Sequence, residues 1–239
     1  MSVLFRRGPK DWTRMILWDT DSDTFTGGQW VKHRVEHGHL SPDGELLVYS
    51  VHNFRAHEKY GNWVAVSRPP YFTALAFWPA SWPGGHGIFT GNRRLELFGF
   101  INDRKEGADK MPLSVVRHEM KFPVEPRLTG PEEWDRSEPK SRRWTLCWKS
   151  GRQRDAGDAD RTFNTSYAVE VGTSFWPLEG ADWATFDQRS RLVISRKGQL
   201  FVANVSPSGI QEKQLADFSA EKPDPTAPEA IAHRWPKRK

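Results

Sequence analysis

Three histidines that lie close together in the sequence could form a metal site. His37 and His39 are two positions apart, so on a strand both side chains point to the same face, and His33 at the end of the preceding strand could come near them. Three imidazoles together with a water molecule would suit zinc. The alternative is a polar strand whose histidines hydrogen-bond to neighbouring parts of the fold, because nothing in the sequence fixes a third ligand.

Two aspartate-rich segments imitate the start of a calcium-binding loop. Asp19, Asp21 and Asp23 have the spacing of the first ligands, but Thr24 stands where such a loop needs glycine and Trp30 where it needs a bidentate glutamate. A hairpin turn, in which aspartate side chains bond to the nearby backbone, explains this segment better. The same interpretation applies to the glycine-containing loop that carries Asp155, Asp158 and Asp160.

The single cysteine, Cys147, excludes an internal disulfide framework and a zinc site built on several thiolates. On a predicted strand Cys147 shares a face with Thr145 and Lys149, while Leu146 and Trp148 point the other way. A nearby cation could lower the pKa of the thiol, but no base is positioned to activate it as a nucleophile. The sequence also has no Gly-x-Ser-x-Gly elbow, phosphate-binding loop or HExxH helix. We therefore predict no catalytic residue and no cofactor, which argues against an enzyme without excluding one.

Basic side chains offer a second kind of candidate site. The chain has a formal net charge of +5, which permits contact with nucleic acid or another anionic partner. Tryptophans could add stacking platforms, although most of them lie on predicted strands where a core needs them. The alternative is that these basic loops are merely solvated. The candidate partner-binding residues are Arg142, Arg143, Arg152, Arg154, Lys237, Arg238 and Lys239.

The elements that must position these residues are short strands. Ser41, Pro42, Asp43 and Gly44 have the residue types of a tight turn, and residues 46–51 after it are rich in β-branched and aromatic side chains. This pattern predicts a chain reversal followed by a buried strand. Similar short runs separated by turn residues continue along the chain, and no long stretch of helical period competes with them. The sequence predicts an all-β fold built from antiparallel meanders.

The turn and the strand after it resemble the Ser-Pro-Asp-Gly repeat of WD-repeat-like β-propellers. Residues 183–192 can be aligned with residues 39–46 if two residues are inserted, and Arg189 and Ser190 then replace Asp43 and Gly44. Strands centred on residues 47, 89, 146 and 193 recur at intervals that bracket the roughly 40 to 50 residues of one four-stranded blade. The resemblance implies a small propeller of four or five irregular blades, with a β-sandwich or split barrel as the alternative. We expect the N-terminal strands to complete the last blade beside residues 209–218.

This resemblance covers residues 1–220, which we predict to form a single propeller-like domain. Residues 221–239 are a proline-rich, basic tail, which we expect to lie extended on the body; a helical turn within residues 227–234, anchored by Trp235, is the alternative. The N-terminus has no apolar core of signal-peptide length, and no segment approaches the roughly 20 apolar residues of a membrane span. The expected location is the cytoplasm.

The resemblance to propellers implies scaffolding more often than chemistry, although fold alone does not settle function. We therefore expect a non-catalytic protein- or peptide-interaction module, such as an adaptor or a subunit of a larger complex, with no membrane contact. One alternative is a propeller enzyme or a metal- or ligand-binding protein that uses the histidine cluster. A second alternative is binding of nucleic acid or another anionic partner.

Overall fold

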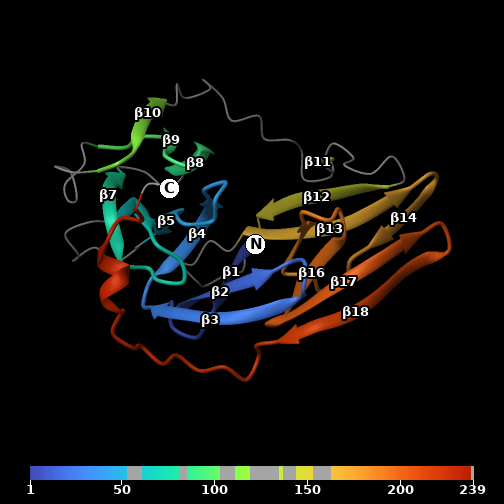
Figure 1. Cartoon of the computed structure of the whole chain (residues 1–239). Helices are drawn as coiled ribbons and strands as arrows, with labels where there is room; N and C mark the ends of the chain where they lie inside the picture. The colour runs from blue at the N-terminus through green and yellow to red at the C-terminus, as the bar shows by residue number, and fades with distance from the viewer. Residues whose placement is uncertain are drawn as a thin grey trace. The chain divides into compact units, whose positions relative to one another are not determined.

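The computed structural model describes residues 1–52, 61–80, 85–102, 111–118, 135–136, 144–152 and 163–237. These residues form five small sheets of three or four strands and one short 3₁₀ helix, so the all-β prediction is confirmed (Figure 1). Within the described residues, no helix is long and apolar enough to cross a membrane. The chain divides into two compact units: Met1–Phe122 with Glu221–Lys239 form unit 1, and Pro123–Ala220 form unit 2.

Unit 1 contains three sheets whose strands follow one another in the chain (Figure 1). All neighbouring strands are antiparallel except β9 and β10, which are parallel. The first sheet contains β1 (Ser2–Arg7), β2 (Thr13–Asp19) and β3 (Thr24–Val31). The second contains β4 (Arg34–Leu40), β5 (Leu47–His52), β6 (Asn62–Ser67) and β7 (Ala74–Ala80). The third contains β8 (His86–Gly91), β9 (Arg94–Phe98) and β10 (Ser114–His118).

The predicted turn after β4 and the buried strand after it are confirmed. Ser41 holds both ends of the turn: its N–H donates to the carbonyl of Leu46 at 2.8 Å, and the N–H of Leu46 donates to Ser41 Oγ at 3.0 Å. Gly44 has a φ of +71°, a left-handed conformation that glycine adopts without steric cost. Every side chain of β5, the strand that follows, is buried.

Asp43 ties this turn to the next sheet. Its carboxylate accepts hydrogen bonds from Ser41 Oγ at 2.6 Å and from the N–H of Glu45 at 3.2 Å, and it pairs with Arg93 at 3.2 Å. Partial burial would raise the pKa of Asp43, but the hydrogen bonds and the charge of Arg93 outweigh it, so the pKa is lowered. A carboxylate with a depressed folded-state pKa stabilises the fold above its unfolded-state pKa, and this stabilisation is lost as the pH falls through the folded-state value.

Replacing Asp43 by asparagine should therefore lower the free energy of unfolding by about 1 kcal/mol at neutral pH, because the ion pair and the charge-assisted bonds are lost. Below the unfolded-state pKa of about 4 the difference from the wild type should shrink, and it should be lost as the pH falls through the lowered folded-state pKa of Asp43. Urea unfolding at neutral and acidic pH measures both effects, with Asp224→Asn at an exposed position as the control. A difference that does not change with pH would contradict this role of Asp43.

Two apolar clusters cover opposite faces of the second sheet. Val48 of β5 packs toward the third sheet in a cluster that includes Leu95 and Leu97. Its neighbours Leu47 and Tyr49 pack on the opposite face, in a cluster that includes Met15 of the first sheet. The other buried members of this cluster are Val35, Val51, Ala65 and Phe72. Side chains alternate between the faces of a strand, so the second sheet is packed between the other two.

The tail returns to unit 1 and docks there. Arg6 and Arg14 both form ion pairs with Glu221, and both guanidinium groups lie over the ring of Trp30. Further along, the helix η1 (Ala230–His233) contacts β7, and Trp235 packs against the cluster that contains Val48. The tail thus contains the helical turn and the Trp235 anchor that the sequence offered as the alternative to an extended segment.

Unit 2 contains two four-stranded antiparallel sheets, again with strands in chain order. Their inner faces share one core, to which Leu146, Val169, Leu192 and Ile194 contribute. The first sheet contains β11 (Asp135–Arg136), β12 (Thr145–Arg152), β13 (Phe163–Val171) and β14 (Ser174–Pro177). The second contains β15 (Trp183–Phe186), β16 (Leu192–Arg196), β17 (Gln199–Ser206) and β18 (Gly209–Asp217).

The turn between β15 and β16 resembles the turn between β4 and β5. Ser190 donates its N–H to the carbonyl of Asp187 at 3.0 Å, as Gly44 does to Ser41 at 2.8 Å. Ser190 has a φ of +59°, so it takes the left-handed position that Gly44 occupies in the first turn. The Asp187 carboxylate accepts the N–H of Arg191 at 2.8 Å and thereby replaces the Ser41 hydroxyl. The two turns therefore share their first hydrogen bond and a left-handed fourth residue, but the first closes between Ser41 and Leu46 and the second one residue earlier, between Asp187 and Arg191.

The expected pairing of the chain ends is wrong. The strands β1, β2 and β3 form a sheet of their own, and β18 is paired with β17 at the end of the four-stranded sheet in unit 2. The first three strands are a complete meander with an apolar face that packs on the second sheet, so they need no fourth strand from the C-terminus. Closure of the five sheets into a propeller stays a prediction.

Candidate functional site

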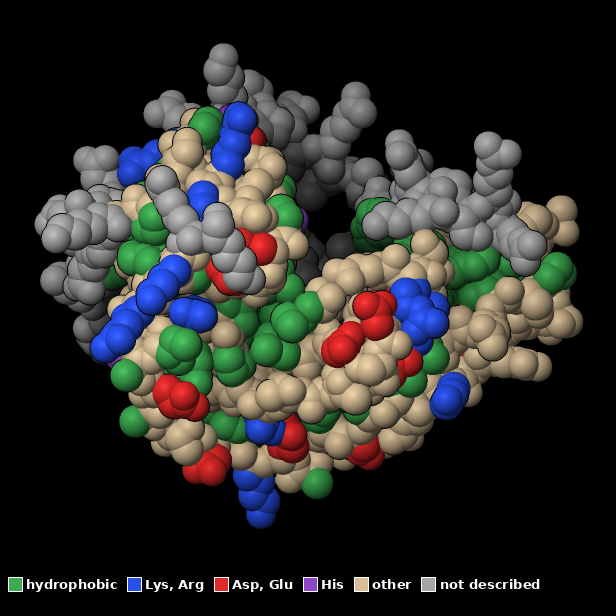
Figure 2. Space-filling model, in the orientation of Figure 1, with side chains coloured by type: hydrophobic (Ala, Val, Ile, Leu, Met, Phe, Trp, Pro, Cys, Tyr) green, Lys and Arg blue, Asp and Glu red, His purple; other side chains and the backbone are tan. Residues whose placement is uncertain are grey.

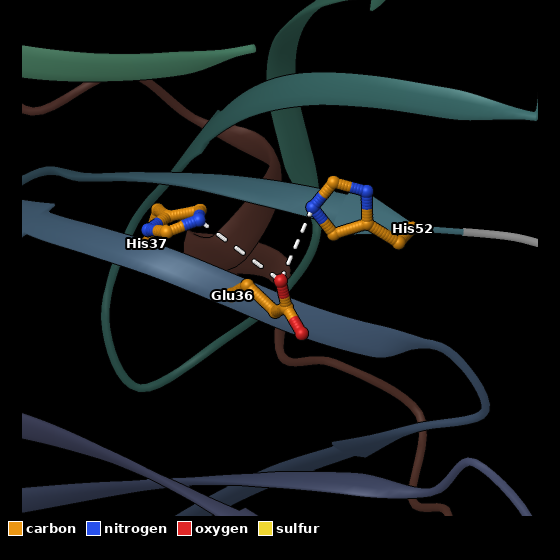
Figure 3. Close-up of side chains that lie close together, drawn as sticks. All are labelled: Glu36, His37 and His52. Atoms are coloured by element: carbon orange, nitrogen blue, oxygen red, sulfur yellow. Dashed lines mark ion pairs between the residues drawn. The ribbon is translucent and has the colours of Figure 1, made fainter. Parts of the chain in front are cut away.

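A cluster of ionisable side chains gathers around Glu36 at the hydrogen-bonded pair of strands β4 and β5 (Figure 3). Glu36 and His37 come from β4 and His52 comes from the end of β5. The Glu36 Oε2 atom lies 3.3 Å from His52 Nε2 and 4.0 Å from His37 Nε2. Both imidazoles are directed at the same carboxylate oxygen, as Figure 3 shows.

A β-bulge explains how two consecutive residues reach the same point. Glu36 pairs with Ser50 and His39 pairs with Val48, so His37 and Gly38 together oppose the single residue between those partners. His37 has a φ of +47°, an uncommon conformation for a residue other than glycine. In a regular strand the two side chains would point to opposite faces. The bulge turns the imidazole of His37 to the side of Glu36.

Gly38 completes the bulge because a side chain does not fit there. A Cβ atom at this position would lie 2.6 Å from two ring atoms of Phe5, which belongs to β1. Glycine therefore lets the first and second sheets of unit 1 approach each other closely beside the cluster.

Two arginines hold the other oxygen of the carboxylate. Arg34 Nε donates to Glu36 Oε1 at 2.6 Å, and Arg7 from the end of β1 donates to the same atom at 2.8 Å. The cluster therefore brings two guanidinium groups and two imidazoles to one carboxylate. Oε1 is occupied by the arginines, and Oε2 is the atom that faces the histidines.

These neighbours set the ionisation of the cluster. Burial would raise the pKa of Glu36, but the hydrogen bond and charge of Arg34, followed by His52 and Arg7, outweigh it and lower the pKa. Burial also lowers the pKa of His37, an effect that Glu36 opposes and His86 reinforces. Glu36 is therefore a carboxylate at neutral pH, and its neighbourhood favours the neutral form of the His37 imidazole.

Asn62 fixes the orientation of His52. The two residues lie directly opposite each other on β5 and β6, and His52 Nδ1 lies 3.2 Å from Asn62 Oδ1. The side chain of His52 is only 6% exposed. With Asn62 Oδ1 as the acceptor, Nδ1 carries a proton and Nε2 is the atom directed at Glu36.

The three histidines that the sequence grouped have different surroundings. Only His37 belongs to the Glu36 cluster. His33 lies edge-on to the ring of Trp63, with 5.1 Å between centroids. His39 accepts a hydrogen bond through Nδ1 from the N–H of Phe89 in β8, so it connects two sheets, as the alternative interpretation proposed for this strand. Zinc binding by all three histidines together stays a prediction.

A row of stacked rings continues from the cluster across the third sheet. His86, Phe98 and His118 lie opposite one another on β8, β9 and β10. The ring centroids are 5.1 Å apart for the first pair and 4.6 Å apart for the second, with nearly parallel planes. His37 lies 6.1 Å from His86 at the near end of this row, and His118 Nε2 pairs with Glu96 at 3.1 Å at the far end.

The sequence matches neither the model of a known protein family nor a curated protein.

The other residues singled out from the sequence either take part in turns or in the core, or fall outside the described residues. Asp19 accepts the N–H of Asp21, and Asp23 accepts the indole N–H of Trp18, as expected for an aspartate-rich turn. Cys147 is buried in β12 with its sulfur 3.9 Å from a carboxylate oxygen of Glu170. The residues outside the described part of the chain are Asp155, Asp158, Asp160, Arg142, Arg143, Arg154, Arg238 and Lys239.

Two of the basic candidates are described. Lys237 is exposed near the end of the tail, and the backbone of Arg152 ends β12. On the face drawn in Figure 2, basic and acidic side chains are interspersed, and hydrophobic side chains reach the surface between them.

Two exposed aromatic side chains mark candidate binding positions in unit 2, one on each of its sheets. Phe175 on β14 is 43% exposed and Trp183 on β15 is 39% exposed. Their neighbours Trp176 and Ala184 belong to the core of the unit, so Phe175 and Trp183 point away from that core. β14 and β15 are the end strands of their sheets, and each therefore presents a backbone edge as well as an aromatic side chain. Sequence reasoning missed this pair because it assigned the aromatic residues of strands to the core.

Proposed function

We propose that this protein is a non-catalytic interaction module that binds a protein or peptide partner, as an adaptor or as a subunit of a larger complex. The observation that carries the proposal is the exposure of Phe175 and Trp183 on end strands of unit 2. Large aromatic side chains supply most of the binding energy at protein interfaces when they become buried in a partner.

The partner best suited to this surface is an extended segment with apolar side chains. A peptide can add to an end strand of a sheet, and alternate side chains of that peptide then meet the exposed ring of the strand that it joins. Both strands are held by antiparallel pairing to their neighbours, β13 and β16. A rigid surface of this kind binds without a large ordering cost.

We further propose that the five sheets are blades of a small β-propeller. Three features support this: the strands of each sheet follow chain order, neighbouring sheets within a unit pack face to face, and similar turns link β4 to β5 and β15 to β16. Radial stacking would bury the faces of such sheets and leave only short edges exposed. The partner proposal does not depend on closure.

The partner proposal is tested by affinity capture with the full chain from extracts of the cells that express it, followed by titration of the purified partner. Replacing both Phe175 and Trp183 by alanine should weaken binding about tenfold or more, because truncation of hot-spot aromatics typically costs over 1 kcal/mol each. The matched control is Ile88→Ala, which removes an exposed apolar side chain from β8 in unit 1. Binding should persist at high salt, since apolar contacts are not screened.

Equal binding by the double variant and the control would contradict the role of this surface. A partner that proves to be nucleic acid, with affinity falling steeply as salt rises, would instead favour the anionic-partner alternative.

A further inference from the structure

Three side chains of the Glu36 cluster present metal-ligand atoms to a common point. One ring nitrogen of His37, one ring nitrogen of His52 and a carboxylate oxygen of Glu36 all lie within 4.8 Å of one another. Ligand atoms around a tetrahedral zinc ion are about 3.3 Å apart, given bond lengths of about 2.0 to 2.1 Å. The distance of 3.3 Å between Glu36 Oε2 and His52 Nε2 already has this value. His37 needs only a small side-chain movement, since its Nε2 is 4.0 Å from the same oxygen.

The hydrogen bond of His52 supplies an independent argument. With Nδ1 donating to Asn62 Oδ1, Nε2 is the ring atom of His52 that faces Glu36 Oε2, at 3.3 Å. A buried metal-binding histidine typically donates its other ring N–H to an oxygen, as His52 does here. His52 is thus a candidate metal ligand, and Asn62 is the partner that orients its ring.

We infer that Glu36, His37 and His52 bind one divalent transition-metal ion, and that zinc suits them best. Two imidazole nitrogens and one carboxylate oxygen are a zinc donor set that leaves the fourth position to water. The side chain of His37 is 59% exposed, which gives the ion and the water access from solvent. This site is in unit 1 and is independent of the proposed partner surface on unit 2.

The two arginines set the expected strength of the site. Arg7 and Arg34 hold Oε1, which orients the carboxylate and leaves Oε2 for the ion. Their positive charges also repel a cation, because like charges a few ångströms apart repel each other strongly where they are partly shielded from water. Removing the charge of Arg7 should therefore strengthen metal binding. The side chain of Arg7 is largely exposed, so this change spares the core.

The experiment uses the purified full chain, stripped of metal by a chelator and dialysed against zinc, with metal analysis of the protein. We expect one zinc ion per chain. His37→Asn should weaken zinc binding at least about tenfold, because one of three protein ligands is lost. Asparagine tolerates the left-handed backbone at this position, so the bulge is retained. His33→Asn, which changes a histidine outside the cluster, is the matched control and should bind zinc as the wild type does.

Arg7→Met should bind zinc about tenfold more tightly than the wild type, which an ion-pair cluster without a metal does not predict. Cobalt added in place of zinc should give visible absorption bands that disappear in His37→Asn. Zinc binding that is absent in the wild type, or equal in the wild type and His37→Asn, would overturn the inference. Tighter binding by Arg7→Met together with loss of binding in His37→Asn would support it.

Discussion

Deletion of residues 221–239 should lower the free energy of unfolding by about 4 kcal/mol. The deletion removes Trp235 from an apolar cluster of unit 1 and the fully buried Ala232, and a half-buried tryptophan alone contributes about 2 kcal/mol of apolar burial. It also removes Glu221, whose carboxylate forms ion pairs with both Arg6 and Arg14. Urea unfolding followed by tryptophan fluorescence measures the loss.

The tail prediction has two controls. Deletion of only residues 238–239 leaves all these contacts in place and should change stability by less than about 0.5 kcal/mol. Glu221→Gln keeps the tail but removes the counter-charge, so it should account for a smaller part of the loss. If the long deletion unfolds at the same urea concentration as the full chain, the tail contributes nothing to unit 1, and the docking of Trp235 has no energetic role.

The tail illustrates what the sequence could not decide. Its four prolines exclude a long helix or a strand, and both an extended segment and a short helical turn satisfied that constraint. The contacts that favour the short helix η1 and its anchor Trp235 come from β7 and the cluster around Val48. These elements precede the tail by more than a hundred positions, so local propensity carries no information about them.

The strands themselves were predictable because their signals are local. The turn at Ser41 and Gly44 is specified by four residue types, and the buried strand after it by a continuous apolar run. Its repeat at Asp187 and Ser190 was found by alignment even though neither key residue is the same. The parallel pairing of β9 and β10 had no such signal, since it depends on a long connection rather than on a turn.

The sequence predicted only part of the Glu36 cluster, namely His37. A regular hairpin continued from the pair Leu40 and Leu47 would place Val35 opposite His52, whereas in the structure Arg34 lies there, so extending the pairing brings His52 only to within one residue of its place on β4. The bulge could not be located in this way. Without it His37 and His39 share a face, which is the arrangement that the spacing predicts. The extra residue turns His37 toward Glu36 and leaves His39 bonded to β8.

Backbone contacts at the edge of β3 show how closely the first two sheets of unit 1 are fitted together. Gln29 donates its N–H to the carbonyl of Pro70 at 3.0 Å, and its side chain accepts the N–H of Phe72 at 2.8 Å. Tyr49 donates its hydroxyl to the carbonyl of Phe72 at 2.6 Å. Three hydrogen bonds therefore hold the segment that faces β3, and it cannot move away without breaking them.

Gly28→Ala should consequently destabilise the protein by about 3 kcal/mol, as expected when a rigid, well-packed site receives an extra methyl group. The new Cβ atom would lie 2.5 Å from the carbonyl oxygen of Pro70 and 2.9 Å from that of Met15, and neither backbone atom can rotate away as a side chain would. Gly91→Ala is the control, because its Cβ atom would meet only Arg94 Cβ, at an ordinary 3.6 Å. Thermal and urea unfolding of both variants measure the difference. Equal stability of the two would mean that β3 is not held against this segment in solution, and the packing of the first sheet on the second would then need another explanation.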